Sequence, residues 1–221
     1  MSIGIIGAGE IGSAFARALA RNGIAATISN SRGPDTLRDF AQELTPHITA
    51  GTIEEAAKAD HVLVAVPWSK LPKALAGLPD WAGRIVIDAN NPIERPLFQP
   101  AELNGRLSTE VFADLVQGAR VVKAFNHLPP HLLSGDPRAE GGSRVLFYSG
   151  DDARSKAQIN ALIAKLGFAG IDLGPVAIGG KLVQFPGRPL PATEPEPREL
   201  RVADRPTAVP FLQLQHGMEE V

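Results

Sequence analysis

The 221-residue chain has no cysteine, few aromatic residues and no long apolar segment. The lack of cysteine excludes disulfides, thiolate metal sites and cysteine nucleophiles, and we predict no metal site. No apolar run approaches the roughly 20 residues that span a membrane, and no basic, cleavable leader precedes the first apolar run at Ile3. A net charge of −2 gives no reason to expect nucleic acid or a membrane surface as partner. We therefore expect a soluble, cytoplasmic protein.

Short apolar runs of strand length alternate with segments of helical period over most of the chain. The expected strands are "SIGIIG", "IAATIS", "HITA", "HVLVAVP", "RIVIDA", "RVVKAFN", "SRVLFYSG" and "AGIDLG". Helices are expected over 11–21, 35–44, from Thr52 onward, 69–76, 109–116 and 151–166, the last with Ala157, Leu162, Ile163 and Leu166 on its apolar side. Thr52 and Glu55 have the spacing of a capping box. The alternation predicts an α/β fold of the Rossmann type, with a doubly wound, mostly parallel sheet and helices on both faces.

The C-terminal part has a different composition. Seven prolines occur between Pro186 and Pro210, a density that excludes a long helix or a central strand. The segment is either an extended arm, lying on the domain or on a partner subunit, or a partly disordered tail. The apolar "VPFLQLQ" favours a docking arm, and hence a homodimer. We predict a Rossmann domain over 1–174 and a C-terminal segment with a proline-rich arm over 175–221.

Three glycines, Gly7, Gly9 and Gly12, follow the first expected strand and open the first expected helix. In a dinucleotide-binding turn the first glycine allows the tight bend, the second lets the backbone approach a pyrophosphate, and the third lets helix and strand pack closely. The backbone N–H groups of Gly9, Glu10 and Ile11 would then bind phosphate at the positive end of the helix. The alternative is a glycine turn with a structural role alone.

The loop after the second expected strand lacks the acidic residue that usually grips the ribose of NAD. Asn30, Ser31 and Arg32 occupy that place, 18 to 20 residues beyond Gly12. Neutral donors and a guanidinium suit the 2′-phosphate of NADP, which a carboxylate would repel. The alternative is a solvated turn, because these residue types all favour turns. We predict that the cofactor is NADP(H).

The chain resembles the NADP oxidoreductases that depend on the deazaflavin coenzyme F420. The resemblance rests on "IGIIGAGEIGSAFARAL", "SNSRGPDTL", "ADHVLVAVPW", "IVIDANNP", "VVKAFNHL", "VLFYSGDD" and "LGFAGIDLG", in this order. The cytosolic domains of transmembrane ferric reductases are similar to the same family. The resemblance implies hydride exchange between NADP(H) and a planar acceptor, either the deazaflavin coenzyme F420 or a flavin.

The resemblance also implies which residues surround the nicotinamide. These residues end three expected strands, where open α/β sheets bind ligands, and they are Val66, Pro67, Ala89, Asn90, Asn91, Ala124 and Asn126. The "ANNP" stretch can equally be an asparagine-proline turn. Lys123 either reaches solvent from a strand end or takes part in catalysis.

His127 and the tail depart from the family pattern. A histidine beside the nicotinamide can serve as general acid for a carbonyl or imine substrate, with Asn126 beside it, or can be an ordinary hydrogen-bonding residue. Lys181 and Arg188 either meet an acidic coenzyme tail or are solvated. The lone tyrosine, Tyr148, has no lysine four residues on, which argues against short-chain dehydrogenase chemistry.

Three functions follow from these observations. The first is an NADPH-dependent reductase of a planar acceptor, which needs positioning more than a strong acid. The second is a reductase of a small carbonyl or imine that uses His127 as acid. The third is a non-catalytic NADP-binding sensor.

Overall fold

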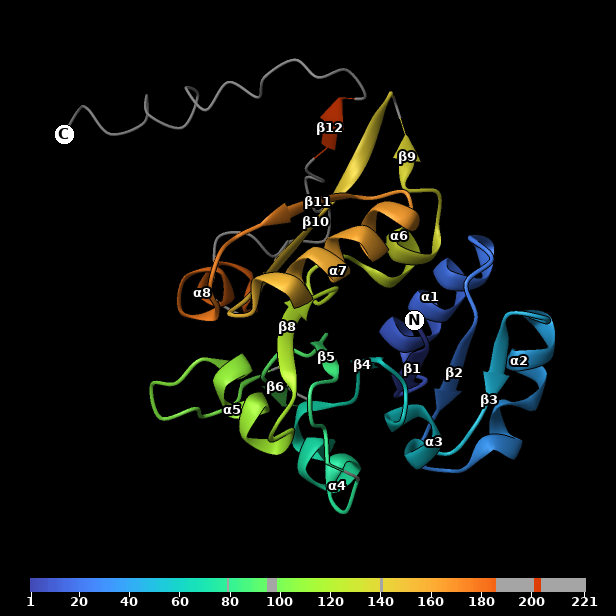
Figure 1. The fold of residues 1–221 in the computed structure, drawn as a ribbon, viewed down its shortest axis with the longest axis horizontal. Coiled ribbons are helices and arrows are strands. Elements are labelled where there is room, and N and C mark those ends of the chain that lie inside the picture. Colours follow the sequence, from blue (N-terminus) through green and yellow to red (C-terminus); the bar gives the residue numbers. More distant parts are fainter. Residues whose placement is uncertain (79, 95–98, 140, 186–200, 204–221) are drawn as a thin grey trace.

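The computed structural model describes residues 1–78, 80–94, 99–139, 141–185 and 201–203 (Figure 1). Its main sheet has the strand order β11-β10-β8-β5-β4-β1-β2-β3. The strands are β1 (Ile3–Ile6), β2 (Ala26–Ser29), β3 (Ile48–Ala50), β4 (His61–Val64), β5 (Ile85–Asp88), β8 (Arg120–Ala124), β10 (Gly142–Gly150) and β11 (Ala169–Asp172). The six strands from β3 to β8 pair in parallel, and β10 runs antiparallel to β8. The predicted mostly parallel α/β sheet is confirmed.

Short strands extend the main sheet and form a small second one. β9 (Arg138–Ala139) and β12 (Arg201–Ala203) both pair antiparallel with the first residues of β10. β6 (Ile93–Glu94) and β7 (Gln99–Pro100) pair with each other. Apart from 201–203, the predicted proline-rich arm beyond Phe185 lies outside the described residues, and Arg188 lies there too.

Helices cover both faces of the sheet (Figure 1). They are α1 (Glu10–Arg21), α2 (Arg38–Glu43), α3 (Ile53–Ala57), α4 (Leu71–Leu75), α5 (Ser108–Leu115), α6 (Pro130–Ser134), α7 (Ala153–Lys165) and α8 (Lys181–Val183), with 3-10 turns at Pro34–Leu37 and Trp68–Lys70 and a π-helical turn at Val176–Gly180. The predicted capping box of α3 is present, because Thr52 Oγ1 accepts from the Glu55 N–H and Glu55 Oε2 accepts from the Thr52 N–H.

Two apolar cores lie on opposite faces of the sheet because side chains of a strand alternate in direction. Leu63 of β4 belongs to the core that α1, α6 and α7 cover. Its neighbours Val62 and Val64 belong to the core under α3, α4 and α5. In α7, Leu162, Ile163 and Leu166 are buried as predicted. The prediction for Ala157 is wrong, because Ala157 is exposed and Ile159 packs inward instead.

The chain reverses its direction of travel across the sheet between β1 and β4. From β1 it moves outward to β2 and β3, and it then returns to place β4 on the other side of β1. The loops after β1 and β4 therefore diverge above and below the sheet, which opens a crevice at their carboxyl ends. This topology positions the candidate site.

Candidate functional site

A cavity of about 550 Å³ opens at the carboxyl ends of the central strands. Its walls come from the loops after β1, β4, β5 and β8, together with Phe185 from the C-terminal segment. Ten of the residues that the sequence predicted for the site border it: Gly9, Glu10, Ile11, Val66, Pro67, Ala89, Asn90, Asn91, Asn126 and His127. The structure thus brings together residues that lie more than 100 positions apart in the chain.

The glycine turn after β1 has the geometry that a dinucleotide requires. A side chain on Gly7, whose φ is 109°, would meet the Ala65 carbonyl oxygen at 2.2 Å, and one on Gly12 would meet the Gly7 carbonyl oxygen at 1.8 Å. A side chain on Gly9 would meet nothing within 4 Å. Gly9 is also the N-cap of α1 and gives it no side-chain cap, so the first turn of the helix starts at the open face. The turn therefore fits a pyrophosphate at Gly9.

The loop after β2 lies next to this turn, because the Gly7 N–H donates to the Ser29 carbonyl. The Asn30 side chain shapes the loop: its Oδ1 accepts from the Arg32 N–H at 2.8 Å and its Nδ2 donates to Thr36 Oγ1 at 2.9 Å. Ser31 and Arg32 are exposed. Arg32 forms no ion pair with any described residue. The loop offers a free guanidinium to an anion beside the turn.

A buried polar network underlies the cavity wall after β5. Lys123 Nζ lies 3.0 Å from Asp88 Oδ2 and also donates to the Asn90 carbonyl, and both charged side chains are fully buried. The Asp88 carboxylate further accepts from Thr109 Oγ1 and from the backbone and side chain of Asn90. Burial lowers the pKa of Lys123, and the nearby Asp88 opposes that shift. Of the two roles considered for Lys123, solvent exposure is excluded.

Both polar atoms of the Asn90 side chain make hydrogen bonds that join the ends of β4 and β5. Its Oδ1 accepts from the Val66 N–H at 3.0 Å, and its Nδ2 donates to the Val64 carbonyl at 3.1 Å. Val66 and Asn90 both border the cavity. Asn90 therefore fixes the wall, and its side chain keeps no free donor for a ligand.

Asn91 and Asn126, which follow the carboxyl ends of β5 and β8, exchange two hydrogen bonds. Asn126 Nδ2 donates to Asn91 Oδ1 at 2.9 Å, and Asn91 Nδ2 donates to the Asn126 carbonyl at 2.7 Å. The same pair anchors the C-terminal segment through the Val183 carbonyl and the Phe185 N–H. Asn126 Oδ1 is buried and has no hydrogen-bond partner among the described residues. Asn126 itself borders the cavity.

The turn at the end of β8 is strained. Phe125 has a φ of 63°, which is unfavourable for a bulky residue, and its ring is held by an edge contact with Phe15 at 4.9 Å between centroids. This packing maintains a backbone conformation that costs free energy on its own. The next two residues, Asn126 and His127, both border the cavity.

His127 is held against β10 as a neutral side chain. Its Nε2 accepts from the Phe147 N–H at 3.3 Å, and its ring lies 5.3 Å from that of Phe147. Burial lowers the pKa of His127 from 6.5 to about 4, Lys123 adds to this shift, and a hydrogen bond with the Val145 backbone opposes it. Nδ1 is buried and makes no hydrogen bond among the described residues.

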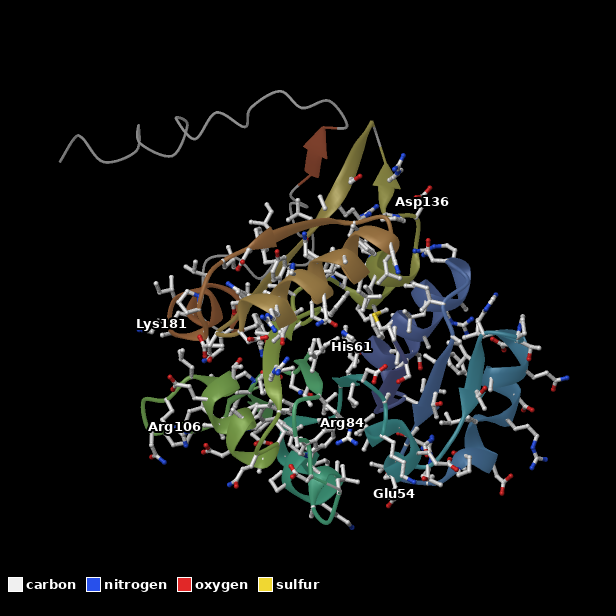
Figure 2. All side chains as sticks on the ribbon, viewed as in Figure 1. Glu54, His61, Arg84, Arg106, Asp136 and Lys181 are labelled. Atoms are coloured by element: carbon white, nitrogen blue, oxygen red, sulfur yellow. The ribbon has the colours of Figure 1, made fainter. Side chains whose placement is uncertain are left out.

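The remaining predicted residues do not border the cavity. Gly7 and Gly12 shape the turn behind it, Asn30, Ser31 and Arg32 lie on the neighbouring loop, and Ala124 is buried within β8. Lys181 is exposed at the start of α8 (Figure 2). The wall is completed by residues that were not predicted for the site: Ala65, Trp68, Ile93, Leu128, Pro129, Pro130 and Phe185. Their position just after strand ends was the available signal, except for Phe185.

No group of three or more histidine or acidic side chains in the described part of the chain is arranged to hold a metal ion. None of the helices in that part combines the length and apolar character needed to cross a membrane.

The fold and the glycine turn at the switch point define a dinucleotide-binding oxidoreductase of the Rossmann type. The sequence model of the NADP oxidoreductase, coenzyme F420-dependent family matches residues 2–92. A crystal structure of a putative F420-dependent NADP-reductase from Arthrobacter sp. FB24 is 32% identical, with a TM-score of 0.67, over 80% of this chain and 86% of that one. The chain belongs to this family and is an NADP-dependent oxidoreductase.

Two other relatives extend the comparison. A hypothetical protein from Sinorhizobium meliloti, known from a crystal structure, is 44% identical with a TM-score of 0.84, over 93% of this chain and 97% of that one. Metalloreductase STEAP3 of Rattus norvegicus is 29% identical over 192 residues, which is 86% of this chain. The chain spans only 37% of the length of that curated relative.

Proposed function

We propose that the protein transfers hydride between NADP(H) and a planar acceptor of the deazaflavin or flavin type, bound in the cavity at the switch point. One observation carries this proposal: a single cavity is bordered by the open turn at Gly9 and by Asn126 and His127, each of which has a buried polar atom, Oδ1 and Nδ1 respectively, without a partner among the described residues. The first feature suits a pyrophosphate, and the other two can orient flat ring systems. The relatives' names favour a deazaflavin as the acceptor.

The residues present fit NADP(H), which supplies the hydride when bound. The N–H groups of Glu10 and Ile11, next to Gly9, would hold the pyrophosphate. Ser31 and Arg32 would hold the 2′-phosphate, with Asn30 keeping their loop in shape. Val66, Pro67, Ala89 and Asn91 would border the ribose and nicotinamide.

Asn126 is suited to orient the nicotinamide ring. Its Nδ2 is committed to Asn91 and the Val183 carbonyl, so only Oδ1 is available to a ligand. An amide oxygen accepts, and the nicotinamide carboxamide carries a donating amino group. We assign Asn126 Oδ1 to that amino group.

His127 is suited to orient the acceptor, not to protonate it. With a pKa of about 4 it is neutral at physiological pH, so its Nδ1 would hydrogen-bond the acceptor without supplying a proton. This favours a ring acceptor, whose reduction depends on positioning. The alternative reaction, reduction of a small carbonyl or imine, needs a general acid with a pKa nearer neutrality.

Anaerobic stopped-flow mixing tests the proposal. Protein loaded with NADPH is mixed with coenzyme F420, with a flavin mononucleotide or with a small ketone, and nicotinamide absorbance is followed. We expect rapid oxidation by a ring acceptor and none by the ketone. Oxidation by the ketone that is lost in His127→Gln would establish the carbonyl alternative, and no oxidation by any of them would leave a non-catalytic NADP-binding sensor.

The homodimer and the cytoplasmic location stay predictions from the sequence. Sedimentation velocity of the full chain measures the first directly, with a monomer at all concentrations as the contradicting result.

A further inference from the structure

A second hollow, of about 570 Å³, lies at the amino ends of the central strands, whereas the cofactor cavity lies at their carboxyl ends. It is bordered by the first residues of three neighbouring strands, His61 of β4, Ile85 of β5 and Arg120 of β8. The register places these three residues abreast, since His61 pairs with Ile85 and Ile85 pairs with Arg120. Nothing in the proposed hydride transfer uses this edge.

His61 is the unusual group in this hollow. The residue is only 3% exposed, and neither Nδ1 nor Nε2 makes a hydrogen bond of good geometry among the described residues. Gln158 of α7 borders the same hollow, and its side chain lies close enough to interact with the ring. Buried polar groups in folded proteins are nearly always hydrogen-bonded, and Gln158 can serve only one ring nitrogen, so the other nitrogen calls for a ligand. Figure 2 labels His61 and, close by, Arg84.

The charges around His61 are predominantly positive. Lys58, Arg84 and Arg120 all border the hollow, and none of them forms a salt bridge within the described ranges. The single carboxylate on the rim, Asp60, already accepts from the N–H and the hydroxyl of Ser2 at 2.8 and 3.0 Å. One N–H of Arg84 donates to the Asp80 carbonyl, which leaves the rest of its guanidinium available.

We propose that this hollow binds a phosphate-type oxyanion, either free phosphate or the phosphoryl group of a small molecule. The buried His61 ring donates to one oxygen, and Arg84 and Arg120 bind the others from the rim. Arginine presents several N–H donors that match phosphate geometry, and such charge-assisted hydrogen bonds are strong. The site is distinct from the phosphate contacts of NADP(H), which lie at the carboxyl ends of the strands.

The pKa of His61 should show whether an oxyanion occupies the hollow. Burial lowers the pKa of His61, whereas Asp60 and Gln158 oppose that shift. An oxyanion in the hollow favours the imidazolium and raises the pKa, because an opposite charge nearby stabilises the protonated form. The charged and titratable groups that border the hollow with the ring are the Met1 amino group, Lys58, Asp60, Arg84 and Arg120. Two carboxylates interact with these cations, Asp152 with Arg120 and Glu54 with Lys58.

The test is an NMR titration of the full chain saturated with NADPH, so that the cofactor's phosphate contacts are filled. Inorganic phosphate is added in one arm and glycerol phosphate in the other, and the ring protons of the five histidines are followed. We expect a saturable shift of the His61 resonance and a raised His61 pKa. Tighter binding in the second arm identifies a phosphoryl group as the ligand, and equal binding identifies free phosphate.

Arg120→Gln and Lys73→Gln form the matched pair of variants, since each removes one exposed cation and Lys73 lies outside the hollow. Loss of one charge-assisted hydrogen bond should weaken phosphate binding by about tenfold or more in Arg120→Gln. Lys73→Gln should bind as the parent does. An unshifted His61 resonance, or an equal loss in both variants, would overturn the proposal.

Thermal melting of His61→Leu provides a second measurement. Leucine removes a buried ring nitrogen that lacks a partner, so this variant should melt at a higher temperature than the parent when phosphate is absent. Phosphate should raise the melting temperature of the parent and leave that of the variant unchanged. An equal rise in both proteins would contradict a role for His61.

Discussion

Lys123 and Asp88 form a fully buried ion pair, with Nζ 3.0 Å from Oδ2. Lys123 Nζ also donates to the carbonyl of Asn90, which borders the cavity. Lys123 arises from β8 and Asp88 from the end of β5, so the pair ties these two neighbouring strands together. Asp88 also accepts hydrogen bonds from Thr109 of α5 and from Asn90. The pair therefore holds the end of β5 in place, and the cavity wall begins there.

Removing one partner of this pair should be far more costly than breaking a surface pair. Lys123→Met leaves the Asp88 carboxylate buried without its cation, which should lower the free energy of unfolding by about 3–5 kcal/mol. Lys156→Met breaks the partly exposed pair with Asp172 and should cost less than about 1 kcal/mol. Urea denaturation measures both. Equal losses would show that the buried pair has no special role.

Alanine at Gly9 should weaken NADPH binding, whereas alanine at Gly12 should lower the stability of the fold. Gly9→Ala adds a methyl group in open space, so the free energy of unfolding should stay within about 1 kcal/mol of the parent value. That methyl group lies where the pyrophosphate approaches, so NADPH binding should weaken by at least about tenfold. Gly12→Ala forces a clash with the Gly7 carbonyl and should destabilise the fold by about 1–3 kcal/mol.

Denaturation and NADPH titration of the two variants separate these effects. A stable Gly9→Ala protein that binds NADPH as tightly as the parent would exclude the pyrophosphate from this turn.

Arg32 should decide between the two nicotinamide cofactors. Arg32→Ala removes a charge-assisted contact to the 2′-phosphate worth about 1.5–3 kcal/mol, so NADPH binding should weaken by roughly tenfold to a hundredfold. NADH lacks that phosphate, so its binding should hardly change. Arg38→Ala is the control, because Arg38 is an exposed cation at the start of α2 that is paired with Asp35. Isothermal titration of the parent and the two variants gives all six affinities, and matching losses for NADPH and NADH in Arg32→Ala would refute the assignment.

His127 should make the protein less stable in mild acid. Its pKa is lowered from 6.5 to about 4 in the folded chain, so between these values the unfolded chain holds a proton that the folded chain does not. Stability therefore rises with pH through this window, and falls as pH drops from 6.5 towards 4, by about 3 kcal/mol in total. His127→Gln should lack this component, since glutamine can still accept from the Phe147 N–H but does not titrate.

Urea denaturation of parent and His127→Gln across that window gives the difference directly. His131→Gln, at an exposed histidine of α6, serves as control. Stability curves of the parent and His127→Gln that run parallel would contradict a buried, neutral His127.

The parts of the fold that could be predicted from the sequence are those whose patterns involve residues close together in the chain. Apolar runs of strand length, the Thr52 capping box and the Gly7–Gly12 spacing depend on residues close together in the chain, and they predicted the alternating elements and the glycine turn. The antiparallel direction of β10 was beyond such signals, because a strand's direction depends on where the connecting chain can cross. The helix α6, only five residues long, has no periodic pattern to detect.

The sequence by itself determined an NADP-dependent α/β oxidoreductase and predicted which loops bind its cofactor, since those features follow from short-range patterns. Tertiary structure alone decided the states of the side chains: that Lys123 is buried against Asp88, that Asn126 pairs with Asn91 and keeps one free oxygen, and that His127 is neutral. Such states depend on burial and on partners 20 to 35 positions away. The physical reason is that pKa values and hydrogen-bond satisfaction are properties of a three-dimensional environment.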